Sequence, residues 1–339
     1  MDNSYRLRVE SLRAMMRARG WDAVIISGSD PHSSEYPALR WKQVEWISGF
    51  TGEAGDIVIT ADHAGLWTDT RYFIQANRQL AGTGIVLHKT RVPDQILIPD
   101  WLADKFPQKD NLVIAVDGLC QQVSAIESIR KALEAAGRSE DMDADYSYRI
   151  ADVPDMLDAL WEDRPAIPVT PIMEVLPDIA GESRIERINW IREALAGMLC
   201  DGALITALDE IAWMLNVRGS DIEYNPMVIS YLLVTEESVR WFVRKDNVRY
   251  DDPYTAGTLA SLRRDGIEIL PYDEIQFSVS ECLQDGTVNK LFVDPGTLNW
   301  SLHNLIKSSG RLVEGPSPVQ LRKAGKNPVE VQGMRRMHL

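Results

Sequence analysis

The sequence is poor in the residues and runs that mark several classes of protein. Among 339 residues the only cysteines are Cys120, Cys200 and Cys282, which lie far apart and form no CxxC pair. Such sparse cysteines favour a reducing cytoplasm over a disulfide-stabilised secreted fold, so we expect a cytoplasmic protein. No apolar run approaches the roughly 18 residues of a membrane-spanning helix. The N-terminus also lacks the apolar segment of a secretory signal.

Common catalytic and ligand-binding motifs are missing as well. The five histidines form no HxxxH or HExxH pair, and no phosphate-binding GxxxxGKS/T loop or GxSxG nucleophile turn occurs. Asp141, Asp143 and Asp145 have the spacing of a calcium loop, but Tyr146 replaces its glycine, which favours a solvated acidic turn. The net charge of −14 disfavours nucleic acid or an anionic membrane surface as a partner.

What the sequence does contain is one order of helices and strands written twice. A chain of 339 residues exceeds the usual size of a single core, which suggests two domains. In the first half, apolar periodicity predicts helices at 71–81, 100–106 and 121–137 and strands at 22–28, 55–60, 65–73, 84–89 and 111–118. In the second half it predicts helices at 184–200 and 299–310 and strands at 227–234, 239–248, 266–272 and 289–296.

Three residue pairs recur at a nearly constant offset between the halves: Asp22 with Asp201, Trp67 with Trp241, and Asp117 with Asp294. The shared order and spacing predict a duplicated α/β domain. Two unrelated α/β domains are the alternative, because both would alternate helices and strands.

Proline clusters indicate where domains end. Four prolines within residues 165–177 predict an extended linker, and the Pro/Gly-rich segment 313–328 predicts a second boundary. We therefore expect domains at 1–155 and 156–322, with 323–339 beginning something else. There, Asn327 is expected to cap a helix that begins at Pro328 and has Glu330 at its third position.

One segment is suited to binding a polar ligand. In GLWTDTRYF, strand alternation predicts Trp67, Asp69 and Arg71 on one face, where Asp69 would orient Arg71 to grip a carboxylate or carbonyl. A surface ion pair beside a half-buried tryptophan is the alternative.

Two other polar groups allow a structural and a chemical interpretation. Asp30 and His32 would suit a base and its orienting partner, although an Asp-Pro turn with solvent-facing side chains is favoured. Arg218, Asp221 and Glu223 cluster on an irregular loop, where a loop-stabilising network is favoured over a site.

Several long segments together resemble the Xaa-Pro aminopeptidases of the aminopeptidase P type. They are DPHSSEY, WISGFTGEAG, LWTDTRYFIQA, LWEDRP, ALDEIAWMLNVRGSDIEYNP and KAGKNPVEVQGMRRMH, and their order matches too. The resemblance implies an α/β fold of two tandem creatinase-N-terminal-like domains, each a mixed β-sheet flanked by helices. In the family a pita-bread domain follows, in which two divalent metals, usually manganese, drive cleavage before a proline in second position.

The resemblance covers only the first two domains and the opening helix of the third, here 323–339. No catalytic or metal-binding residue carries over, so we expect the inactive N-terminal region of a dimeric, metal-dependent aminopeptidase that shapes the substrate cleft. By motif position, Arg71 and Glu35 are the expected substrate-binding residues. Thr70 stands where relatives usually have glycine, which leaves the aim of Arg71 open. A free-standing assembly module and an unrelated small-molecule enzyme that uses Arg71 are the alternatives.

Overall fold

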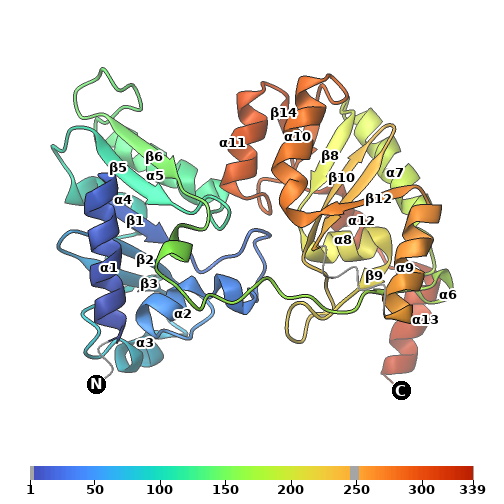
Figure 1. The fold of residues 1–339 in the computed structure, drawn as a ribbon, viewed down its shortest axis with the longest axis horizontal. Helices are drawn as coiled ribbons and strands as arrows, with labels where there is room; N and C mark the ends of the chain where they lie inside the picture. Colours follow the sequence, from blue (N-terminus) through green and yellow to red (C-terminus); the bar gives the residue numbers. More distant parts are fainter. Residues whose placement is uncertain (1–3, 245–251, 339) are drawn as a thin grey trace. The chain divides into compact units, whose positions relative to one another are not determined.

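The chain folds into two compact units in a computed structural model that describes residues 4–244 and 252–338 (Figure 1). The first unit comprises the residues up to Pro31 together with Leu39–Ala166 and Asn299–Ser301. The second comprises His32–Ala38, Ile167–Leu298 and the residues from Leu302 onward. Each unit is an α/β domain with its own sheet and core, as expected.

The first unit is built on a mixed six-stranded sheet in the order β4-β3-β2-β1-β5-β6. Only β2 runs antiparallel to its neighbours, so the carboxyl ends of the other strands share one edge of the sheet. The strands are β1 (Ala23–Ile26), β2 (Asp56–Thr60), β3 (Ala64–Thr68), β4 (Val86–Lys89), β5 (Leu112–Val116) and β6 (Tyr148–Asp152).

Helices cover both faces of this sheet, and the central strands are therefore apolar throughout. Val24 and Ile26 pack with Leu12 of α1, whereas Ile25 points to the opposite face and packs with Ile129 of α5. The helices are α1 (Ser4–Arg19), α2 (Gln43–Ser48), α3 (Phe73–Gln79), α4 (Ile98–Lys105) and α5 (Val123–Ala135), with short 3-10 turns at Leu39–Trp41 and Met156–Ala159.

The second unit repeats this plan in the order β12-β11-β10-β8-β13-β14. Its strands are β8 (Gly202–Ile205), β10 (Ser230–Thr235), β11 (Val239–Val243), β12 (Ile267–Pro271), β13 (Leu291–Val293) and β14 (Leu312–Glu314), with a small separate pair, β7 (Met173–Glu174) and β9 (Val217–Arg218). Its helices are α6 (Pro177–Ala180), α7 (Arg184–Gly197), α8 (Leu208–Leu215), α9 (Pro253–Arg264), α10 (Ile275–Gln284), α11 (Trp300–Ser308), α12 (Pro318–Ala324) and α13 (Pro328–Met337), with a 3-10 turn at Tyr272–Glu274.

The predicted duplication is confirmed by the matching strand orders and by equivalent hydrogen bonds. After β5, the Asp117 carboxylate accepts the N–H of Leu119 and that of Asp155 beyond β6, each at 3.1 Å. After β13, the Asp294 carboxylate accepts the N–H of Gly296 and that of Ser317 beyond β14, each at 2.8 Å. The two aspartates therefore fasten the same two loops in each unit, which coincidental similarity would not produce.

Two boundaries differ from the sequence predictions, and a third lies partly outside the described residues. The strand expected over 65–73 ends at Thr68, where the chain turns into α3. The end of the strand expected over 239–248 lies outside the described residues. The chain enters the second unit after Ala166 rather than after residue 155, because Met156, Leu157 and Trp161 pack in the first core.

The proline-rich segments contain more structure than expected. The segment 313–328 contains the end of β14 and helix α12 rather than a plain boundary, because fully buried Val319 packs in the second core. The linker is irregular through residues 160–172, but Ile172 is also fully buried in that core. Local proline content indicates where regular structure is interrupted, but burial of these apolar residues holds both segments in place.

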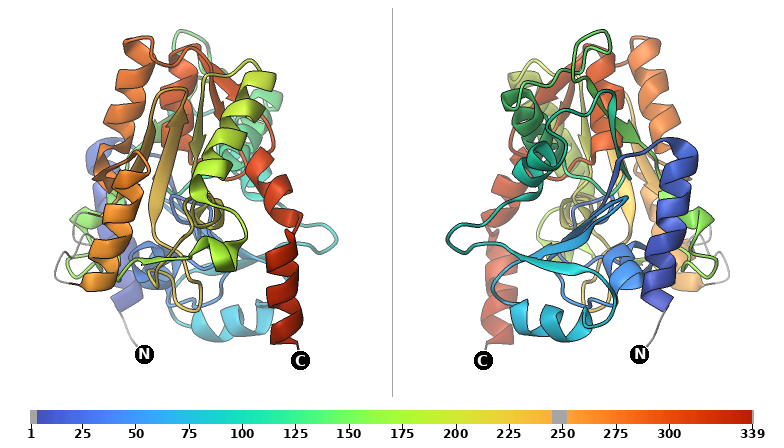
Figure 2. Two further views of the ribbon diagram at one scale, coloured as in Figure 1. Left: turned by 90° about the vertical axis from the view of Figure 1, so that its right-hand side faces the viewer. Right: turned by 90° about the vertical axis from the view of Figure 1, so that its left-hand side faces the viewer.

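The terminal helix α13 begins as predicted. Asn327 and Glu330 exchange side-chain-to-backbone hydrogen bonds across the first turn, and Pro328 is the first helical residue. The Asn327 side chain also donates to the carbonyl oxygen of Ala180 in α6 at 2.7 Å. Figure 2 shows α13 in dark red, following α12. Within the part of the chain that the structure describes, none of the helices is long and apolar enough to cross a bilayer.

Candidate functional site

The Asp69–Arg71 turn lies directly after β3 at the carboxyl edge of the first sheet. The Asp69 carboxylate, whose side chain is 7% exposed, accepts the Arg71 backbone N–H at 3.0 Å and its Nη2 at 2.8 Å. The hydrogen bond from Arg71 lowers the pKa of Asp69. The Arg71 side chain remains 60% exposed and lies over the ring of Tyr72 at 5.0 Å. A buried anion thus holds an exposed guanidinium in place, an arrangement suited to gripping a carboxylate or carbonyl.

The predicted face of Trp67, Asp69 and Arg71 is present only in part, because Trp67 and Asp69 line one pocket and Arg71 does not. Trp67 belongs to the apolar core, where its indole N–H donates to the Ile96 carbonyl oxygen at 3.0 Å. Alternation fails after Thr68 because the strand gives way to a turn. Thr70 is not one of the described residues with a positive φ, so the chain turns here without requiring glycine.

Glu35 lies in the second unit, on the short segment His32–Ala38. Its side chain is exposed and lines a pocket of about 310 Å³. The opposite wall includes Leu208 and Asp209 at the start of α8, together with Asn225. Glu35 and Arg71 therefore belong to different units.

His32 anchors this segment. Its ring is 2% exposed, Nδ1 lies 2.9 Å from the Thr206 carbonyl oxygen, and Nε2 lies 2.9 Å from the Tyr272 hydroxyl. The ring also packs on Tyr231, with 4.4 Å between centroids. Because both nitrogens have partners inside the second unit, the histidine fixes the segment that carries Glu35. The expectation that Asp30 and His32 face solvent is wrong, because the two residues are 1% and 2% exposed.

The loop after β9 is held by a structural network, as favoured from the sequence. The buried Asp221 carboxylate accepts the Thr170 N–H at 3.0 Å, its hydroxyl at 2.6 Å, and the Ile229 N–H at 2.9 Å. Arg218 donates to the carbonyl oxygens of Ala212 and Val217, each at 2.8 Å. These charges are used to hold the backbone.

Sequence analysis missed a polar group beside the Asp69–Arg71 turn. Asp56 begins β2, and Gln121 precedes α5; both line one pocket at the edge where the parallel strands end. Ligands often bind at this edge of α/β sheets, so the positions of these residues next to predicted strands were the available signal.

Within residues 4–244 and 252–338, no group of three or more His, Cys, Asp or Glu side chains is placed to hold a metal ion.

Comparisons with known proteins agree with this division. The family model described as the creatinase/prolidase N-terminal domain matches residues 8–149, and a second model of the same description matches residues 163–330. Xaa-Pro aminopeptidase 1 of Dictyostelium discoideum is 35% identical over 334 residues, which are 98% of this chain and 51% of that protein. Xaa-Pro aminopeptidase app-1 of Caenorhabditis elegans is 32% identical over 335 residues, which are 97% of this chain and 51% of that protein.

A solved structure is similar over nearly the whole chain. The X-prolyl aminopeptidase of Caenorhabditis elegans, described as a cytosolic enzyme with a di-nuclear active site, has a TM-score of 0.86 and 29% sequence identity. The match covers 99% of this chain and 53% of that enzyme. The chain thus spans about half the length of the relatives it matches.

Proposed function

Because the chain belongs to the creatinase/prolidase N-terminal domain family, we propose that it is the non-catalytic N-terminal region of a metal-dependent Xaa-Pro aminopeptidase. The complete enzyme would remove the first residue of peptides that have proline in second position. The main support is that nearly the whole length of this chain matches about half the length of such enzymes. Residues 323–339 would then be the opening of the pita-bread peptidase domain.

In this proposal, Arg71 and Glu35 contact the peptide substrate and help to shape the cleft. The support for Arg71 is its exposed guanidinium, which the buried Asp69 carboxylate holds at 2.8 Å. The support for Glu35 is its position on a pocket wall, on a segment fixed by His32. The two divalent metals, manganese by family resemblance, would be bound by the peptidase domain and supply the nucleophile. We further propose a cytoplasmic homodimer to which these N-terminal units contribute contacts.

The first test is an assay of this chain by itself. Purified chain is incubated with manganese and a peptide that has proline in second position, and release of the first residue is followed by mass spectrometry. We expect no turnover, because the described residues offer no metal site. Steady turnover that a chelator abolishes would contradict the proposal.

The second test separates this role from that of a free-standing assembly module. Reading the gene beyond the codon for Leu339 should reveal a domain rich in metal-binding Asp, Glu and His residues. A genuine stop at that point would favour the free-standing module.

The third test concerns Arg71 in the complete enzyme. Loss of a charge-assisted contact to substrate should lower kcat/KM by about tenfold to a hundredfold in Arg71→Ala, with metal content unchanged. Arg78→Ala is the matched control, because Arg78 is exposed on α3 in the same unit. Equal kinetics for Arg71→Ala and the unsubstituted enzyme would exclude a substrate role for Arg71.

A further inference from the structure

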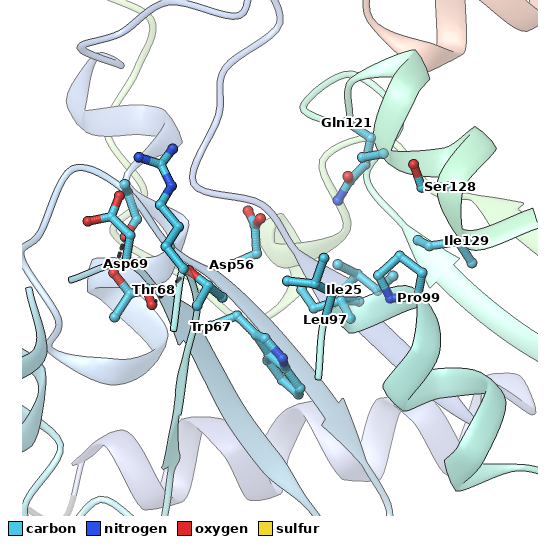
Figure 3. A pocket seen from close by; sticks show the side chains of 16 residues that line it. Ile25, Asp56, Trp67, Thr68, Asp69, Leu97, Pro99, Gln121, Ser128 and Ile129 are labelled. Atoms are coloured by element: carbon cyan, nitrogen blue, oxygen red, sulfur yellow. Dashed lines mark hydrogen bonds between the residues drawn. The ribbon is translucent and has the colours of Figure 1, made fainter. Parts of the chain in front are cut away.

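A pocket of about 380 Å³ lies in the first unit at the edge where its parallel strands end (Figure 3). Its walls come from β1, the start of β2, the end of β3, and helices α4 and α5. The volume lies within the range of pockets that hold small organic ligands, about 300–1,000 Å³.

Most of the pocket wall is apolar and rigid. Ile25 of β1 and Ile129 of α5 belong to the core between the sheet and this helix, and Leu97 adds a further aliphatic side chain. The Trp67 ring is fixed by its hydrogen bond to the Ile96 carbonyl oxygen and by stacking on His88, with 3.9 Å between centroids. This wall suits a planar or branched apolar body.

Several polar groups of the lining already have partners inside the protein. The Thr90 hydroxyl donates to the Thr68 carbonyl oxygen at 3.0 Å, and the Ser128 hydroxyl donates to the Ser124 carbonyl oxygen at 2.8 Å. The Asp69 carboxylate is paired with Arg71. These groups are therefore poor candidates for binding a ligand.

Gln121 is different. It is 5% exposed, yet its side-chain nitrogen Nε2 has no hydrogen-bond partner among the residues that the structure describes. Its backbone is held, because the Gln121 carbonyl oxygen accepts the Trp300 N–H at 2.9 Å. Buried polar groups in folded proteins are nearly always hydrogen-bonded, so an orphaned donor that faces a pocket points to an acceptor supplied by a ligand.

Asp56 provides the complementary group. Its Oδ1 accepts the Gly28 N–H at 3.0 Å, and the Ser27 side chain also donates to the carboxyl group, so these two bonds fix it. Figure 3 shows the Asp56 carboxyl and the Gln121 side chain extending toward the same space, with Ile25 below them. Burial raises the pKa of Asp56, which is consistent with a carboxyl group kept from bulk water. Asp56 and Gln121 thus offer one acceptor and one donor beside an apolar wall, and the exposed Arg91 also lines the pocket.

We propose that this pocket binds a small amphipathic molecule that carries a primary amide. The ligand's amide oxygen accepts from Gln121 Nε2, its N–H donates to the Asp56 carboxyl, and its apolar body packs against Trp67. A primary amide presents an acceptor and a donor side by side, and it remains uncharged in an apolar pocket. This site uses neither Arg71 nor Glu35 and is independent of the proposed peptidase role.

Benzamide is the probe, titrated into the chain and followed by saturation-transfer NMR. We expect saturable binding with a dissociation constant of about 1 mM, typical of a small fragment. N,N-dimethylbenzamide keeps the ring and carbonyl but lacks the N–H, and should bind about fivefold more weakly. This comparison uses the unsubstituted chain and so does not depend on the folding of any variant.

Variants place the binding in the pocket. Gln121→Leu removes the orphaned donor at similar size and should weaken benzamide about fivefold, whereas Ile129→Trp fills the pocket and should abolish binding. Ser128→Ala should leave binding unchanged, because that hydroxyl is used within α5. Gln284→Leu, in the second unit, is the matched control for the glutamine replacement. Absence of saturable binding by the unsubstituted chain would overturn the proposal. Binding by Gln121→Leu and by Ile129→Trp as tight as that of the unsubstituted chain would overturn it as well.

Discussion

Arg187 lies inside the second unit, and its replacement by methionine should destabilise that unit severely. The side chain is 1% exposed and lies on α7. Its guanidinium donates to the carbonyl oxygen of Trp213 and the side-chain oxygen of Asn216, both at the end of α8. Nε donates to the Glu182 carboxylate at 3.2 Å, and the cation lies 4.0 Å from the centroid of the Trp213 ring. One side chain therefore joins α7, α8 and the segment before α7.

The expected cost follows from the groups that Arg187→Met leaves behind. Methionine fills much of the volume, but it leaves the Trp213 carbonyl oxygen and the Asn216 amide oxygen without this donor. Among the described residues, the Glu182 carboxylate keeps only its ion pair with Arg322. Removing one partner of a buried ion pair costs about 3–5 kcal/mol. That is a large share of the roughly 5–15 kcal/mol that stabilises a domain. Arg187→Lys keeps the charge but not the planar fork, so it should lose less.

Urea unfolding combined with hydrogen-exchange mass spectrometry measures this cost in each unit. In Arg187→Met, peptides from β8 and β10 should lose protection at lower urea, whereas peptides from β1 and β5 should keep theirs. Arg192→Met, on the same helix, is the matched control; Arg192 donates one hydrogen bond to the Thr235 carbonyl oxygen, so about 1 kcal/mol should be lost. A loss in Arg187→Met no greater than that of the control would refute the reasoning.

Three further changes test other contacts of the second unit. Burial raises the pKa of Glu210 from 4.5 to about 7, so the contribution of Glu210 to stability should fall as pH rises across that interval. In Glu210→Gln the free energy of unfolding should therefore depend less on pH between these values. An unchanged pH dependence would count against this role of Glu210. Asn327→Ala removes the α13 cap and should cost about 1 kcal/mol of helix stability, seen as faster amide exchange in α13 than in Asn327→Ser. Asp221→Ala leaves the Thr170 and Ile229 N–H groups without their acceptor and should lower the free energy of unfolding by about 3 kcal/mol. Asp221→Asn should lose less. Equal stability of Asp221→Ala and the unsubstituted chain would argue against the network.

The sequence predicted the elements and the duplication well because these depend on local and repeated signals. Central strands such as β1 and β5 are buried on both faces, so they read as continuous apolar runs. The Asn327 cap is a local signal within four residues, and the structure contains both of its hydrogen bonds. The same reasoning failed after Thr68, because strand alternation has no signal for the residue at which pairing ends.

The interior of α7 shows what could not be predicted. The segment was correctly expected to be helical, but both Arg184 and Arg187 are buried. Their burial depends on acceptors brought from α8, such as the Leu215 carbonyl oxygen, which Arg184 Nε reaches at 3.0 Å. A charged residue is buried only where tertiary structure supplies its partners, so its own position in the sequence gives no indication of it.

Candidate sites were harder to predict for a related reason. Asp69 and Arg71 are near neighbours in sequence, so their pairing was foreseeable. Gln121 and Asp56 meet only because β5 and β2 flank β1 in the sheet, and nothing in either segment alone indicates the other.

The fold that the two units share helps to explain where these sites arise. In both units an aspartate, Asp117 or Asp294, fastens the loops beyond two neighbouring parallel strands by accepting two backbone N–H groups. Beyond β3 the Asp69 carboxylate binds Arg71, and in the loop between β5 and α5 Gln121 Nε2 finds no partner among the described residues. Polar side chains that form no hydrogen bond within the fold are the ones available to a ligand. The duplicated hydrogen bonds therefore account for the fold, whereas function has to be sought in the side chains that they leave without a partner.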